Sequence, residues 1–258
     1  MGVLRFGVGP IAAGEERAKV RAHAESALAR AAGSHAILVV TKSYKEVEDK
    51  LARGEVDLAW LPPALCVRAI ERGATLLLGC VRASEKTYRA VLFVRADSPR
   101  RVPADLSGAR AAWVDPDSCS GYLFPRIALS EDHGLDPATL FGEEKMLGSH
   151  AAVVAAVTKR RADCGATFAA AVPDDMRWIL TSAPIPNDAV CAAPSMDRAR
   201  RDALGAALAE LHRSADGALA LRELFDVARL EPALPRHYDL VRRAMAGTGA
   251  AISSTKFR

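Results

Sequence analysis

Short apolar runs alternate with longer helical stretches along this chain, and glycine follows many of the helical stretches. In the first 81 residues the apolar runs lie at 4–8, 37–40, 56–60 and 75–81, with helical stretches at 15–32, 43–53 and 63–72. Gly33, Gly54 and Gly73 stand at or just after the ends of these stretches, where a left-handed residue commonly ends a helix. This alternation predicts βαβ units around a largely parallel sheet.

A second block with the same alternation begins near Tyr88. Its expected strands lie at 91–94, 111–114, 145–147, 162–167 and 177–181, with helices at 120–133 and 149–161. A short strand at 189–192 follows, and then helices at 197–213, 215–225 and 236–245. We therefore expect an α/β chain of two lobes, residues 1–85 plus 190–258 and residues 86–189, with crossings near 83–90 and 182–190.

The composition, with 50% hydrophobic and 26% charged residues, is typical of an ordinary soluble globular protein. No run of 18 apolar residues exists, so we expect no membrane insertion. An apolar strand follows Met1 almost at once, with no basic and then apolar leader. A cytoplasmic protein is expected from the sequence as written, or a periplasmic one if a leader was removed.

Cysteine and charge patterns argue against metal and nucleic-acid binding. The cysteines are odd in number and lack CxxC spacing, which predicts neither a zinc site nor a disulfide framework, and we expect no cofactor. The net charge is +4, but the basic residues are spread out without interleaved aromatic residues, so a nucleic-acid surface is not expected. The cysteines are Cys66, Cys80, Cys119, Cys164 and Cys191.

The stretch 113–126, WVDPDSCSGYLFPR, places a polar turn between an apolar strand and a helix. Ser118, Cys119, Ser120 and Gly121 lie where the helix begins, and the first backbone N–H groups of a helix have no partner inside it. Free N–H groups and the positive end of the helix dipole favour an anion. Gly121 is expected to let a ligand approach the backbone closely.

The segment GVGPIAAG (7–14) also lies between a strand and a helix and invites comparison with a dinucleotide-binding loop. The spacing of Gly7, Gly9 and Gly14 does not fit that motif, and no acid follows the second strand to bind a ribose. We expect this first loop to line an anion site instead.

Five segments in order make the chain similar to the solute-binding proteins of phosphonate and phosphate ABC transporters. The resemblance covers nearly the whole chain and implies a venus-flytrap fold of periplasmic-binding-protein type II, with a small oxoanion held between the lobes and no catalysis. It also implies an ABC permease as partner, or a signalling partner if the chain is a sensor. The segments are SYKEVEDKLARGEVDLAWLPP (43–63), VDPDSCSGYLFPRIAL (114–129), GSHAAVVAAV (148–157), TSAPIPND (181–188) and HYDLVRRAM (237–245).

By this resemblance the anion-binding SxSG element of the family is Ser118, Cys119, Ser120 and Gly121. Cys119 departs from the pattern, because threonine is usual there, and one hydroxyl donor is missing. The family's Ser-His pair matches Ser149 and His150, at a second helix start. A protonated His150 would add positive charge where an anion sits.

Three further residues are implied by the same resemblance. Tyr44 and Tyr88 match the tyrosines whose hydroxyls close over the ligand, although packing between the lobes is the alternative for both. Asp188 matches the end of the PND segment at the return crossing, where it is equally explained as a turn residue of a hinge.

An enzyme is the competing hypothesis. Cys119 at a helix N-terminus is expected to have a lowered pKa, and His150 could act as its base. The sequence supplies neither a positioned third group nor a metal motif, so a passive replacement of threonine is favoured.

The resemblance also implies something about the class of anion, because relatives that take an amino-bearing phosphonate need carboxylates, supplied by segments after the Ser-His helix, to meet its ammonium group. Residues 164–172, after the Ser-His helix, hold no carboxylate, and the next is Asp174. A buried ammonium group without a counter-charge is costly. We therefore expect phosphate, phosphite or methylphosphonate to bind better than 2-aminoethylphosphonate, with Asp188 as the one residue that could accept the amine.

Overall fold

This computed structural model describes residues 2–11, 14–83 and 85–252. The chain divides into two compact units, Met1–Thr87 with Pro186–Asp239 and Tyr88–Ile185 with Leu240–Arg258. The last helix, which we had expected in the first lobe, thus groups with unit 2 from Leu240 onward. A methyl group built on Gly247 would lie 3.9 Å from Ile127 Cδ1, which places this helix against a helix of unit 2.

Unit 1 is built on a six-stranded sheet in the order β13-β4-β12-β3-β1-β2. β1 pairs in parallel with β2 and β3, whereas β12 runs antiparallel between β3 and β4, and β13 runs antiparallel beside β4. The expected largely parallel sheet is therefore a mixed one. Its strands are β1 (Leu4–Val8), β2 (Ala36–Val40), β3 (Leu58–Leu61), β4 (Thr75–Val81), β12 (Ala189–Ala192) and β13 (Arg229–Pro232).

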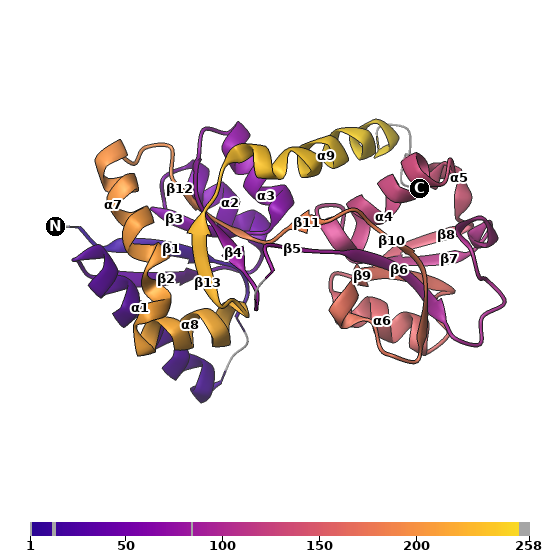
Figure 1. Ribbon diagram of the computed structural model, residues 1–258, viewed down its shortest axis with the longest axis horizontal. Coiled ribbons are helices and arrows are strands. Elements are labelled where there is room, and N and C mark those ends of the chain that lie inside the picture. Colours follow the sequence, from indigo (N-terminus) through magenta and orange to yellow (C-terminus); the bar gives the residue numbers. More distant parts are fainter. Residues whose placement is uncertain (1, 12–13, 84, 253–258) are drawn as a thin grey trace. The chain divides into compact units, whose positions relative to one another are not determined.

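Helices flank the unit 1 sheet on both faces (Figure 1). Phe6 and Val8 of β1 belong to the core shared with the helices α1, α7 and α8, whereas Gly7, which faces the other way, lies against Val47 of α2. These helices are α1 (Glu15–Ala32), α2 (Tyr44–Ala52), α3 (Pro63–Glu71), α7 (Arg198–Ala209) and α8 (Ala215–Phe225), with 3₁₀ turns at Leu211–Arg213 and Pro235–Tyr238.

Unit 2 is built on a five-stranded sheet in the order β10-β6-β9-β7-β8, again mixed. β7 pairs in parallel with β8 and β9, whereas β6 runs antiparallel between β9 and β10. Its strands are β6 (Ala90–Arg95), β7 (Arg110–Trp113), β8 (Glu143–Met146), β9 (Cys164–Phe168) and β10 (Met176–Thr181). Its α-helices are α4 (Phe124–Ile127), α5 (Pro137–Leu140), α6 (His150–Thr158) and α9 (Asp239–Ile252), with 3₁₀ turns at Pro103–Leu106 and Ala169–Ala171.

The two crossing segments contain one short strand each, β5 (Thr87–Tyr88) and β11 (Ile185–Pro186), which pair as a two-stranded sheet. These strands, together with α5 and β13, were not expected from the sequence. In the described part of the chain, no helix is both long and apolar enough to span a bilayer.

The helix expected at 120–133 is interrupted by two π-helical turns, Cys119–Leu123 and Ala128–Asp132, on either side of α4. Pro125 has no backbone N–H and cannot donate to the carbonyl of Gly121. That carbonyl accepts instead from the backbone N–H of Val114, at 3.2 Å. The wide first turn thus depends on Pro125 together with the contact between Gly121 and Val114, and such turns occur frequently at functional sites.

Candidate anion-binding site

The carboxyl ends of β7, β8 and β9 lie next to one another at one edge of the unit 2 sheet. The backbone N–H of Leu147 donates to the carbonyl of Trp113 at 2.9 Å, and that of Gly148 to Val114 at 2.8 Å. These bonds tie together the loops that lead to the Ser118 turn (residues 118–121) and the Ser149 turn (residues 149–150). Ligands of open α/β sheets bind at such an edge.

Ser118 caps the π-helical turn. Its Oγ accepts the backbone N–H of Gly121 at 3.0 Å, and its carbonyl accepts the N–H of Leu123 at 3.0 Å. One lone pair of the hydroxyl is therefore used inside the protein. The hydroxyl proton remains available to donate.

Gly121 is explained by packing rather than by ligand approach. A Cβ at this position would lie 2.3 Å from Cγ2 of Val114 and 2.7 Å from Oγ of Ser118. The close packing explains why glycine stands here, and the approach of a ligand to its backbone stays a prediction. Its N–H is also already paired with Ser118.

Ser120 differs from Ser118 and Gly121 in the hydrogen bonding of its polar groups. The residue is only 2% exposed. Within the described ranges, neither its Oγ nor its backbone N–H has a hydrogen-bond partner. Among the described residues, Oε2 of Glu48 is the one fully enclosed side-chain oxygen or nitrogen without a partner. The Ser120 hydroxyl therefore still reaches solvent, and it can donate to a ligand.

His150 is the first residue of α6, and Ser149 caps this helix by accepting the N–H of Ala152 at 3.2 Å. The Nδ1 atom of His150 lies 2.8 Å from Oγ1 of Thr167, and its ring packs edge-on to Phe168. Burial lowers the pKa of His150, so the ring is neutral at pH 7. The charged imidazolium considered from the sequence is corrected to a neutral hydrogen-bonding group.

Cys119 is buried, with 4% exposure. The ring nitrogen Nδ1 of His150 pairs with the hydroxyl of Thr167 and not with this thiol. Nδ1 is therefore not the nitrogen of His150 that could take a proton from Cys119.

In unit 1, Tyr44 opens α2 just beyond the carboxyl end of β2. Its ring packs on Gly9, where a Cβ would lie 2.4 Å from Tyr44 Cε1. The first loop thus supports this ring; residues 12 and 13 of the loop lie outside the described residues. Tyr44 is 38% exposed. Desolvation of the part of it that is covered, and then the charge of Asp188, raise its pKa to about 12, so its hydroxyl stays protonated and can donate.

Asp188 stands directly before β12, whose first residue, Ala189, pairs with Leu61, the last residue of β3. Its Oδ2 accepts from Nη2 of Arg82 at 2.9 Å and from Nε1 of Trp60 at 3.1 Å. Arg82 also donates to Oδ1 of Asn187, and Tyr238 donates to the Asn187 carbonyl at 2.9 Å. The PND segment is thus built into a buried network, and its carboxylate already has a cationic partner.

Sequence reasoning did not find Arg82, Trp60 or Asn187. The sequence signals that could have pointed to them are their positions: Arg82 directly follows a predicted strand, and Asn187 lies within the PND turn. No spacing rule connects residues more than 100 positions apart, and only the antiparallel insertion of β12 brings them together.

Tyr88 and Asp174 occupy different ends of unit 2. Tyr88 is half-buried in β5, directly before β6 begins beside the carboxyl end of β9. Asp174 precedes β10, whose first residue pairs with Arg95 at the opposite, amino end of β9. Asp174 is therefore placed at the far edge of the sheet from His150 and does not belong with the site.

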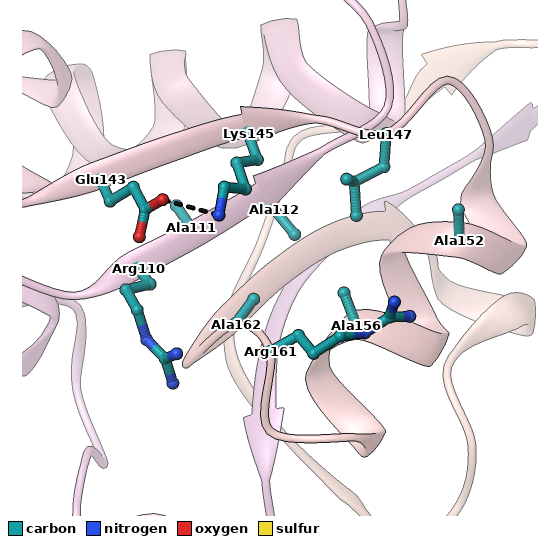
Figure 2. Close-up of a pocket in the computed structure, with 10 residues that line it drawn as sticks. All are labelled: Arg110, Ala111, Ala112, Glu143, Lys145, Leu147, Ala152, Ala156, Arg161 and Ala162. Carbon is teal, nitrogen blue, oxygen red and sulfur yellow. Dashed lines mark ion pairs between the residues drawn. The ribbon is translucent and has the colours of Figure 1, made fainter.

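A cavity of about 290 Å³ lies between α6 and the strands β7 and β8 of unit 2 (Figure 2). Alanine side chains line much of it, and Lys145 and Glu143 form an ion pair of 2.7 Å at its rim. None of the predicted site residues lines this cavity. Across the residues that the structure describes, no three His, Cys, Asp or Glu side chains gather as a metal site would require.

Two α/β units joined by two crossing segments form a fold of the periplasmic-binding-protein type. Serine-capped helices begin at the carboxyl edge of the sheet in each unit. The model of the family described as ABC transporter, phosphonate, periplasmic substrate-binding protein matches residues 6–238. The chain belongs to this family. The predicted family, fold class and lack of enzymatic activity are thereby confirmed.

Solved structures share this fold at low sequence identity. XAC2383 from Xanthomonas citri, solved bound to ATP, matches with a TM-score of 0.81 and 22% identity over 98% of this chain and 99% of that one. PhnD1 from Prochlorococcus marinus, in complex with methylphosphonate, matches with a TM-score of 0.78 and 16% identity over 96% of this chain and 98% of that one.

A relative with a higher identity covers less of the chain. The phosphate-import protein PhnD of Mycolicibacterium smegmatis is 33% identical over 110 residues, which make up 41% of this chain and 34% of that protein. The match therefore spans about a third of that relative.

Proposed function

We propose that this chain binds a small phosphate-like oxoanion, namely phosphate, phosphite or methylphosphonate. The observation that carries the proposal is Ser120, buried and without a partner for either its hydroxyl or its backbone N–H. Ser118, Ser149 and His150 add polar groups at the same sheet edge. An oxoanion accepts several such bonds at once, and bonds to a charged acceptor are the strong ones.

The ligands of solved structures with a similar fold support the proposal that the anion carries a phosphorus–oxygen group. One was solved with methylphosphonate and another with ATP, and both ligands present tetrahedral phosphorus with several oxygens. The Ser118 turn offers donors for such a head. A nucleotide remains an outcome of the binding test rather than a second proposal.

The charges around Asp188 support a ligand without an amine. Its carboxylate is paired with Arg82, so it offers little net negative charge to an ammonium group. Asp174 lies at the wrong end of its sheet. We expect phosphate or methylphosphonate to bind at least tenfold more tightly than 2-aminoethylphosphonate, about 1.4 kcal/mol.

The partner proposed is the permease of an ABC transporter, to which the loaded protein would deliver its anion. A signalling partner that responds to the loaded state is the alternative for the same ligand. Both roles require anion binding first.

Titration calorimetry with phosphate, phosphite, methylphosphonate, 2-aminoethylphosphonate, ATP and sulfate tests the proposal. We expect one site per chain with the first three ligands, and weaker binding of the aminoalkyl compound. No binding of any small oxoanion at millimolar concentration would overturn it. Tight binding of ATP alone would replace the small anion by a nucleotide.

A further inference from the structure

Two cysteines of unit 1 meet in its core although they are 125 positions apart in sequence. Cys66 lies in α3 and Cys191 in β12, and their Sγ atoms are 3.6 Å apart. Both residues are 0% exposed. The two thiols are therefore in direct contact, and their sulfur atoms need to move only slightly closer to form a covalent bond.

Their surroundings make the folded thiols unreactive. The hydrogen bond to Cys191, and then burial, raise the pKa of Cys66 well above its ordinary value, and the thiolate is the reactive form. An oxidant also has no access to a fully buried pair. Oxidation must therefore occur while the chain folds, before α3 closes over β12.

We propose that Cys66 and Cys191 form an intramolecular disulfide when the chain folds in the presence of a disulfide oxidant. Each thiol gives up its hydrogen, and one sulfur–sulfur bond forms between the two residues. The two electrons and two protons pass to the oxidant, whose own disulfide is reduced to two thiols. In a reducing compartment the pair stays as two thiols.

The structure selects this pair among the five cysteines. Cys119 and Cys164 belong to unit 2, and the sulfur of Cys164 lies 3.9 Å from the carbonyl of Arg110. Cys80 of β4 is the remaining cysteine of unit 1 and is 2% exposed. It belongs to the core packed against α1, α7 and α8, which includes neither Cys66 nor Cys191. The contact between Cys66 and Cys191 joins a helix to the strand that directly follows Asp188.

The experiment is refolding from guanidinium chloride with either oxidised glutathione or a phosphine reductant. With oxidised glutathione we expect an intact mass lower by two hydrogens, and a non-reduced digest in which the peptide of Cys66 is joined to that of Cys191. A bond that closes so long a loop restricts the unfolded chain. The melting temperature should therefore rise by about 5–15 °C over the reduced form.

Variants sharpen the test. Cys66→Ser and Cys191→Ser should each abolish the mass change and the rise in melting temperature, whereas the matched controls Cys164→Ser and Cys80→Ser should keep both. An unchanged mass after oxidative refolding would overturn the proposal. A cross-link through Cys80, or glutathione adducts without any cross-link, would do the same.

Discussion

The geometry of the Ser118 turn predicts that Ser120 contributes to ligand affinity, whereas Ser118 contributes to the stability of the fold. Ser120→Ala removes a hydroxyl that has no protein partner, whereas Ser118→Ala removes the cap of Gly121. Losing one hydrogen bond to a charged ligand costs about 1.5–3 kcal/mol, which lowers affinity about tenfold to 150-fold. Losing a cap costs about 0.5–2 kcal/mol of stability. The sequence alone suggested one shared role for both serines.

The two variants are compared by thermal melting without ligand and by calorimetry with methylphosphonate. Ser120→Ala should melt close to the temperature of the original protein, because the hydroxyl that it deletes has no partner within the protein, and should bind much more weakly. Ser118→Ala should melt a few degrees lower. Ser130→Ala is the matched control, since Ser130 is exposed in the second π-helical turn and should change neither quantity.

Unchanged affinity in Ser120→Ala would refute the reasoning, because it would mean that the Ser120 hydroxyl does not donate to the ligand. A large fall in melting temperature in this variant would refute it as well, since the hydroxyl would then have a partner inside the protein.

Three further outcomes are expected. Tyr44→Phe should weaken methylphosphonate binding about tenfold in calorimetry, and Gly9→Ala should weaken it too, because its Cβ would lie 2.4 Å from the Tyr44 ring; full affinity in both would remove this ring from the site. Arg82→Gln unmasks the Asp188 carboxylate, so a competition titration should show affinity shifting towards 2-aminoethylphosphonate by about tenfold; the double variant with Asp188→Asn should cancel the shift. Burial lowers the pKa of His150, so the unfolded chain binds its proton first. The free energy of unfolding should therefore fall as pH drops from about 6.5 towards the folded pKa, and level off below it. Chemical denaturation of His150→Gln should lack this fall, and an unchanged pH profile would contradict the assignment.

The sequence by itself determined the local elements and the family. Glycine after a helix and serine before one act through hydrogen bonds to residues three or four positions away. The roles of Gly33 at the end of α1 and Ser43 at the start of α2 can therefore be recognised from the sequence. The order of the serine-rich turns along the chain was enough to indicate an anion-binding receptor. The placement of the Ser118 and Ser149 turns at one sheet edge follows from parallel strands alone.

The tertiary structure decided everything that depends on contacts between distant segments. The return strand β12 inserts antiparallel between β3 and β4, and this gives Asp188 its partners Arg82 and Trp60. The division of roles between Ser118 and Ser120 depends on the π-helical turn, which arises because the Gly121 carbonyl finds Val114 instead of the missing N–H of Pro125. Propensity and capping are local, whereas pairing, burial and charge compensation are fixed by packing between residues far apart in the chain.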